Sequence, residues 1–146
     1  MKKILFFAIA LVASALTFTS CEKNGGNALV GTWSRDTQAD ASGWYETQIL
    51  TFKANNGYFF QGIQHDPERP DINSAMLFEG TYEIKGDIVT VHYTNHGWSY
   101  GDQTEWVPGW EGRDEKIKFS IDGKSLTIIR NYGEEYQNEP EVYTKQ

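Results

Sequence analysis

The sequence predicts an all-β domain, an antiparallel up-and-down β-barrel of eight or nine strands that follows an N-terminal signal helix. Three observations support this prediction. From Leu29 onward, apolar residues recur at every second position, as in strands with one buried face. Short runs are separated by turn residues, and Asn56-Gly57 is a typical hairpin turn. After position 29 no window of eleven residues has the apolar spacing of an amphipathic helix.

Sequential hairpins account for most of the expected strands. Three hairpins join 49–53 to 58–64, 78–84 to 89–93, and 117–121 to 126–130. The full set of expected strands is 30–36, 44–53, 58–64, 75–84, 88–95, part of 104–107, 116–121, 126–131 and 137–144. This number favours a closed barrel, which leaves no exposed edges, and a two-sheet sandwich is the alternative.

Two segments depart from the strand pattern. Residues 65–74 contain Pro67 and Pro70 and are expected to form a loop, because proline removes a donor from the sheet. Residues 95–112 are rich in Gly, Trp and polar residues, which fits either a long loop or a pair of short irregular strands.

The first 21 residues indicate export from the cytoplasm. Met1-Lys2-Lys3 is a positive start, Ile4–Phe18 is an apolar run, and small residues then precede Cys21, the only cysteine. A run of this length is too short to span a bilayer, which requires about 20 residues. The segment is therefore interpreted as a cleaved signal peptide and excluded from the fold.

The residues around the cleavage site, Phe18-Thr19-Ser20-Cys21, resemble the lipobox of bacterial lipoproteins. The resemblance implies that Cys21 is lipidated and that acyl chains anchor the protein in the bacterial cell envelope, at the outer membrane, with the periplasmic or surface face left open. An ordinary signal peptide followed by a free thiol is the alternative. The expected layout is a signal peptide at 1–20, a polar, glycine-rich tether at 21–28 and a barrel domain at 29–146.

The charge balance argues against several partners. Without Lys2 and Lys3, the 13 basic residues become 11 against 20 acidic ones, a net charge of −9. An acidic domain is a poor ligand for nucleic acid or anionic lipid, so membrane attachment is assigned to Cys21. With Cys21 lipidated no disulfide is possible, and we expect a monomer stabilised by an ordinary core.

Four short motifs resemble the lipocalin-like domains of bacterial lipoproteins. They are Gly31-x-Trp33, the hairpin 52–57, the strand 80–84 and the final segment 142–145. In lipocalins the tryptophan closes one end of the barrel and an arginine of the last barrel strand lies across it. The resemblance implies these roles for Trp33 and Arg130.

The barrel interior is expected to hold large side chains. The inward candidates are Phe52, Phe60, Phe78, Tyr82, Tyr93 and Phe119. An eight-stranded barrel holds either one small ligand or its own side chains, so a filled interior and a roomy pocket both remain open.

The predicted binding site is the segment 98–110, which holds three of the five tryptophans among acids and amides. Its tentative contacts are Trp98, Tyr100, Trp106 and Trp110. Such rings could form a platform for a sugar or a lid over an apolar pocket, or they could be structural cover. The leading hypothesis is non-catalytic binding of a small apolar or saccharide ligand. The alternative is an interaction module with a filled barrel that docks a protein or glycan.

Metal and catalytic chemistry are not expected. His92 and His96, taken to lie on one strand face, would be about 13 Å apart, too far for one zinc ion. The acidic residues between Asp102 and Glu115 suggest a glycosidase, but a charge-rich loop is usually solvated. We therefore expect no metal, no cofactor and no enzymatic activity.

Overall fold

The computed structural model describes residues 26–70, 74–108, 112–135 and 138–146. The predicted signal helix lies outside these residues. A single helical turn, α1 (Gly26–Leu29), precedes nine strands. The strands are β1 (Gly31–Asp36), β2 (Tyr45–Phe52), β3 (Gly57–His65), β4 (Ser74–Lys85), β5 (Ile88–Tyr100), β6 (Gln103–Pro108), β7 (Asp114–Asp122), β8 (Ser125–Ile129) and β9 (Glu141–Lys145).

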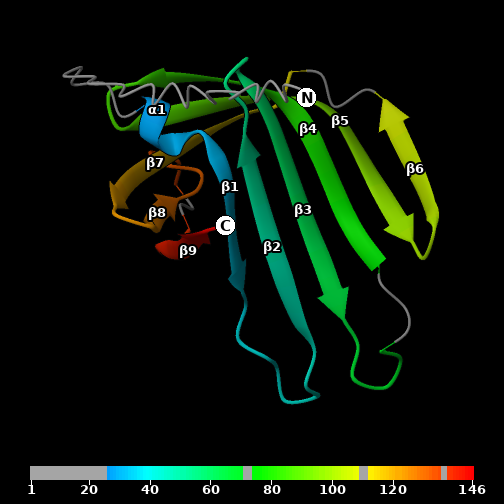
Figure 1. Ribbon diagram of the computed structural model, residues 1–146. Helices are drawn as coiled ribbons and strands as arrows, with labels where there is room; N and C mark the ends of the chain where they lie inside the picture. The colour runs from blue at the N-terminus through cyan, green and yellow to red at the C-terminus, as the bar shows by residue number, and fades with distance from the viewer. Residues whose placement is uncertain (1–25, 71–73, 109–111, 136–137) are drawn as a thin grey trace, which may run out of the picture.

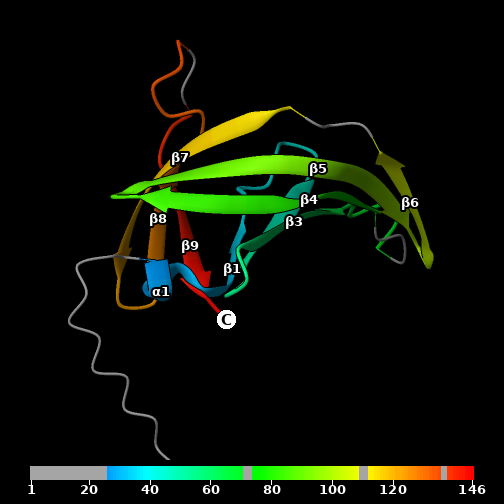
Figure 2. The ribbon, with the colours of Figure 1, turned by 90° about the horizontal axis from the view of Figure 1, so that it is seen from above.

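Eight antiparallel strands close into a barrel, as predicted (Figures 1 and 2). The strand order is β4-β3-β2-β1-β9-β8-β7-β5, and pairing of β5 with β4 completes the closure. The ninth strand, β6, pairs with β5 alone among the described residues. At the predicted turn between β2 and β3, Asn56 has a φ of 63°, the positive value that hairpin turns require.

The segment that the sequence left open, 95–112, contains a regular hairpin. β5 continues to Tyr100 and pairs with β6 residue by residue, from Asn95 opposite Pro108 to Tyr100 opposite Gln103. The turn is tight because Gly101, with a φ of 58°, supplies the positive φ that a two-residue connection needs. β9 begins at Glu141, later than predicted, directly after Pro140.

A β-bulge divides β5 into two halves. Gly80 pairs with Tyr93 while Glu79 pairs with Asn95, so Thr94 is an extra residue. A Cβ atom on Gly80 would lie 2.1 Å from the carbonyl oxygen of His92, which explains why glycine occupies the first position of the 80–84 motif. The bulge shifts the alternation, so that odd-numbered residues face inward before Thr94 and even-numbered residues after it.

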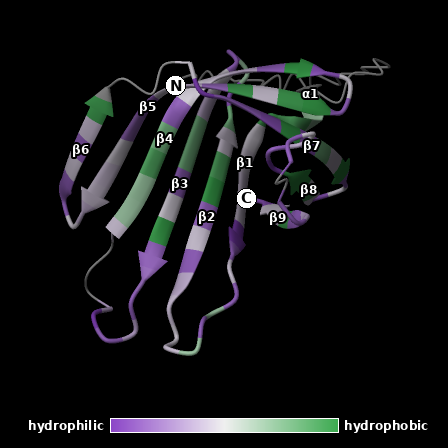
Figure 3. Cartoon of the chain, turned by 180° about the vertical axis from the view of Figure 1, so that it is seen from behind, coloured by the Kyte–Doolittle hydropathy of each residue, from purple (hydrophilic) through white to green (hydrophobic). Residues whose placement is uncertain are grey.

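Side chains fill the barrel interior. The buried cluster consists of Leu29, Trp33, Leu50, Phe52, Tyr58, Phe60, Tyr82, Val89, Val91, Ile117, Phe119, Leu126, Ile128 and Tyr143. Phe78 and Tyr93 pack against this cluster, so the predicted inward aromatic residues all face the core. Figure 3 shows hydrophobic and hydrophilic bands alternating along the strands.

Trp33 is fully buried, as predicted, but Arg130 does not have its predicted role. The indole Nε1 of Trp33 donates a hydrogen bond to the carbonyl oxygen of Leu29 at 2.8 Å. The cation over the Trp33 ring is Lys145, with its Nζ 5.1 Å from the ring centre. The guanidinium of Arg130 lies over Phe60 at 5.2 Å. Arg130 faces inward as expected, but β9 rather than β8 is adjacent to Trp33 and supplies the cation.

Candidate functional site

A cluster of charged residues crosses the barrel interior beside the apolar core. We call Arg35, Glu115, Arg130 and Glu141 the ionic belt. Arg130 donates from Nη1 to Glu115 at 3.2 Å and from Nε to Glu141 at 3.3 Å. Arg35 lies 3.4 Å from Glu141. The belt carries two positive and two negative charges, so it is balanced without a ligand.

Tyrosine hydroxyls complete the hydrogen bonding of the belt carboxylates. Tyr93 donates to Glu115, and the hydroxyl of Tyr143 lies 2.8 Å from Glu141. Burial raises the pKa of both tyrosines, so they remain neutral donors. Burial alone would lower the pKa of Arg130, but the negative charges of its neighbours, Tyr58 where it is ionised and the carboxylate of Glu115, outweigh burial and hold that pKa well above its usual value.

Two polar atoms at the belt are packed too closely for water to reach them. Arg130 Nη2 and the hydroxyl of Tyr58 are shielded from solvent, and neither has a hydrogen-bond partner among the described residues. A void large enough for one water molecule would expose these atoms to it. Around these two atoms the side chains are therefore packed too closely for a ligand.

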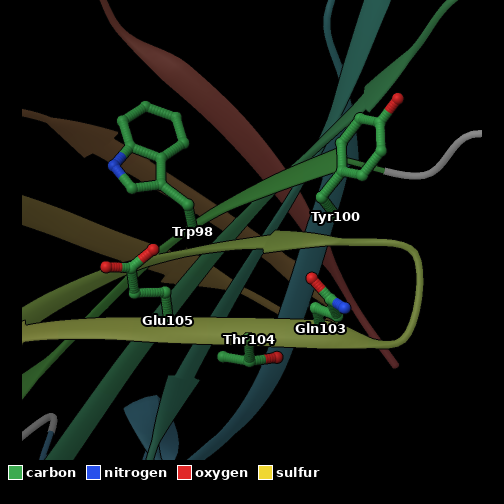
Figure 4. A pocket seen from close by; sticks show the side chains of 5 residues that line it. All are labelled: Trp98, Tyr100, Gln103, Thr104 and Glu105. Carbon is green, nitrogen blue, oxygen red and sulfur yellow. The ribbon is translucent and has the colours of Figure 1, made fainter.

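The predicted aromatic residues that face an accessible region are Trp98 and Tyr100. They lie on the same face of β5, two residues apart, with 53% and 59% of their surfaces exposed. Across the hairpin, Glu105 is directly opposite Trp98 and Gln103 directly opposite Tyr100. In Figure 4 these four side chains project to one side of the hairpin, while Thr104 lies on the other. We call these four residues the aromatic face.

The aromatic face borders a hollow of about 460 Å³, which Thr104 also lines. Its lining combines two planar rings with an amide and a carboxylate. Rings of this kind offer apolar surfaces, while the amide and carboxylate donate and accept hydrogen bonds. The polar members were not predicted as contacts. Their position depends on the pairing of β5 with β6, which the sequence pattern did not reveal.

The other two predicted contacts do not join this face. Trp106 pairs with Gly97 and therefore lies on the opposite side of the hairpin, where it is 41% exposed. Two atoms of its ring would lie 2.9 and 3.2 Å from a Cβ on Gly97, so the indole packs over that glycine. Trp110 lies outside the described residues.

The histidines are separated for a reason other than the predicted one. The bulge at Thr94 places His92 on the outer side and His96 on the inner side of the sheet, so the assumption of a shared face was wrong. His92 contacts Asp114 at 2.8 Å, and the ring of His96 stacks on Phe78. Within the ranges that the structure covers, no group of three metal-ligating side chains is found.

The acidic residues between Asp102 and Glu115 are also dispersed. Glu115 is in the ionic belt and Asp114 is paired with His92, while Asp102 and Glu105 are exposed on the hairpin. Glu111 lies outside the described residues. The arrangement therefore places no two of the described acids of this segment together in the hollow.

No protein-family model and no curated protein matches this chain. In the part of the chain that the structure describes, no helix has the length and apolar character needed to span a bilayer. The fold class is thus established by the strand pairing alone, and the function must be argued from the aromatic face.

Proposed function

We propose that this protein is a membrane-anchored, non-catalytic binding module of lipocalin-like type that takes a saccharide on the aromatic face. The observation that carries the proposal is the exposure of Trp98 and Tyr100 side by side, opposite Glu105 and Gln103. An exposed aromatic pair rimmed by polar groups commonly marks a binding site in a soluble domain.

The chemistry of the face suits a saccharide better than an apolar ligand. Successive inward residues of a strand are about 7 Å apart, so two rings present a continuous apolar strip. The carbon-bound hydrogens of a sugar ring can pack on this strip while its hydroxyls bond to Gln103 and Glu105. An apolar ligand would need burial over most of its surface, which a packed barrel interior and an open hollow do not supply.

The packed interior also favours docking at the surface over enclosure of a ligand. Of the two hypotheses drawn from the sequence, the interaction module with a filled barrel and a glycan partner agrees with Arg130 and Tyr58 being shielded from water. Binding therefore needs no opening of the barrel.

Saccharide binding is tested by titrating the full-length protein, in non-ionic detergent, with a panel of short neutral oligosaccharides while tryptophan fluorescence is recorded. Trp98→Ala should weaken binding about tenfold or more, as truncation of a central aromatic contact does. Trp106→Ala is the matched control, because this indole is on the same hairpin but on its other side. Equal losses in both variants, or none in Trp98→Ala, would reject the aromatic face.

Anchoring is a separate part of the proposal and rests on the apolar run before Cys21. The Cys21→Ser variant should leave the membrane fraction and lose labelling by a palmitate analogue. Unchanged labelling of this variant would show that the acyl chain is elsewhere.

A further inference from the structure

The strand β6 leaves one sheet edge without a partner among the described residues. Every other strand has neighbours on both sides, because the eight barrel strands pair in a closed ring. β6 pairs with β5 through six consecutive residues and with no other described strand. Figures 1 and 2 show it at the margin of the sheet, with no strand beyond it. A closed barrel normally removes such edges, so this one calls for an explanation.

The tight turn determines which backbone groups face outward. In a hairpin with a two-residue turn, the flanking pair is hydrogen-bonded, here Tyr100 and Gln103, and the bonding alternates from there. Gln103, Glu105 and Val107 therefore direct their N–H and C=O groups at β5. Thr104 and Trp106 direct theirs away from it, toward the free edge.

The free edge is open to another chain. Residues 103–107 are exposed throughout, and no hydrogen bond engages the outward groups of Thr104 or Trp106 within the described ranges. Proteins usually protect an edge with a short strand, charged side chains (above all lysine), a bulge or proline. β6 has six residues and one charged side chain, Glu105. The pairing of β6 with β5 has no bulge, β6 has no lysine, and its proline, Pro108, is the terminal residue.

The local charge determines which chain would fit. From Ile88 to Pro108 the sequence has no lysine or arginine, whereas Asp102 and Glu105 are exposed acids. Arg69, a cation of the neighbouring loop, is paired with Asp66 at 2.8 Å. A second copy paired along β6 would bring two acidic hairpins together, which like-charge repulsion disfavours. A segment carrying cations has the complementary charge.

We propose that β6 is a docking edge for an extended polypeptide segment that carries lysine or arginine and adds to the sheet as a further strand. The outward groups of Thr104 and Trp106 supply the main-chain hydrogen bonds. Asp102 and Glu105 attract the cationic side chains of the segment. This site is the edge of the hairpin. It shares Glu105 with the aromatic face but uses neither the Trp98 nor the Tyr100 ring, so it does not depend on saccharide binding.

The test uses an alternating Lys-Val peptide as the probe and the full-length protein in non-ionic detergent. Binding is measured by calorimetry, and amide hydrogen exchange locates it. Thr104→Pro removes an outward N–H while leaving the bonds to β5 intact, and it should weaken binding about tenfold. Thr104→Ala keeps the N–H and is the matched control. Glu105→Gln should weaken binding and reduce its dependence on salt concentration.

We expect the Lys-Val peptide to protect the Thr104 and Trp106 amides from hydrogen exchange. Peptide binding should be lost in Thr104→Pro and retained in Thr104→Ala. An alternating Glu-Val peptide should not bind. Equal binding of both peptides, equal affinity in both Thr104 variants, or no binding of the Lys-Val peptide would overturn the proposal. A dimer that forms without peptide and is lost in Thr104→Pro would also overturn it, because the occupant would then be a second copy. Titration of Trp98→Ala with the Lys-Val peptide separates the two proposals, because this variant should lose saccharide binding and keep peptide binding.

Discussion

Replacing Arg130 by methionine should destabilise the barrel strongly. The Arg130 side chain is only 13% exposed, and its two partners, Glu115 and Glu141, are 11% and 12% exposed. An exposed ion pair contributes at most about 1 kcal/mol, but removing one member of a buried pair costs about 3 to 5 kcal/mol. With these small exposed fractions, the ion pairs of the belt count as buried pairs. The larger figure reflects the carboxylate that is left without its cation.

The two carboxylates would not be affected equally. Without Arg130, Glu141 keeps its contact with Arg35 and with the hydroxyl of Tyr143. Glu115 would keep the hydrogen bond from Tyr93 but no positive charge among its described contacts. Most of the loss in stability should therefore arise at Glu115. Adding Glu115→Gln to the Arg130→Met variant should recover part of this stability, because the positive and negative charges of the belt are then equal again.

Urea unfolding followed by tryptophan fluorescence measures both variants, and calorimetry gives their melting temperatures. For a domain of this size, a loss of 3 to 5 kcal/mol corresponds to a fall of about 10 to 25 °C. A loss below about 1 kcal/mol for Arg130→Met would refute the reasoning, since the belt would then behave as a surface ion pair. A double variant less stable than Arg130→Met would refute the assignment of the cost to Glu115.

Three further predictions concern the core. Gly80→Ala should cost about 3 kcal/mol in urea unfolding, because a Cβ would meet a backbone oxygen at 2.1 Å. Tyr143→Phe should cost about 1.5 to 3 kcal/mol in the same measurement, through loss of a hydrogen bond to the Glu141 carboxylate. Burial raises the pKa of Tyr58, Tyr82, Tyr93 and Tyr143 above 10, so above that pH unfolding releases their protons. The free energy of unfolding should therefore fall as the pH rises beyond about 10. Absorbance at 295 nm should show that these tyrosines ionise only when the protein unfolds.

The barrel was predictable because its strands repeat one local rule. Alternation placed the core residues of β2, β3, β7 and β8 on the correct face, and turn residues such as Asn56 located the hairpins. The rule fails where the chain adds a residue. Counting onward by two from Val91 and Tyr93 puts Asn95, Gly97 and Ser99 inward, a polar and small set that looks like the end of a strand. The bulge at Thr94 was not visible in the sequence.

The candidate site was predictable only in part, because faces depend on register. The abundance of aromatic residues identified the right hairpin, but only the pairing of Trp98 with Glu105 and of Gly97 with Trp106 shows that the two indoles point in opposite directions. The same limit applies to Arg130. Its inward parity was correct, but the aromatic ring beneath it depends on which strands are adjacent in the closed barrel.

One structural feature connects the bulge, the aromatic face and the free edge. β5 pairs with β7 through Ile88–His92 and with β6 from Asn95 onward, so the bulge at Thr94 lies where one partner replaces the other. Before the bulge, β5 is part of a closed barrel with a packed interior. Beyond it, β5 pairs with β6 and the sheet stays open, which leaves Trp98 and Tyr100 exposed on the inner side and the far edge of β6 without a partner among the described strands. The two proposed sites thus share one structural cause and both use Glu105, but the face depends on the rings of Trp98 and Tyr100, whereas the edge depends on backbone groups of Thr104 and Trp106. Substitutions can therefore separate them.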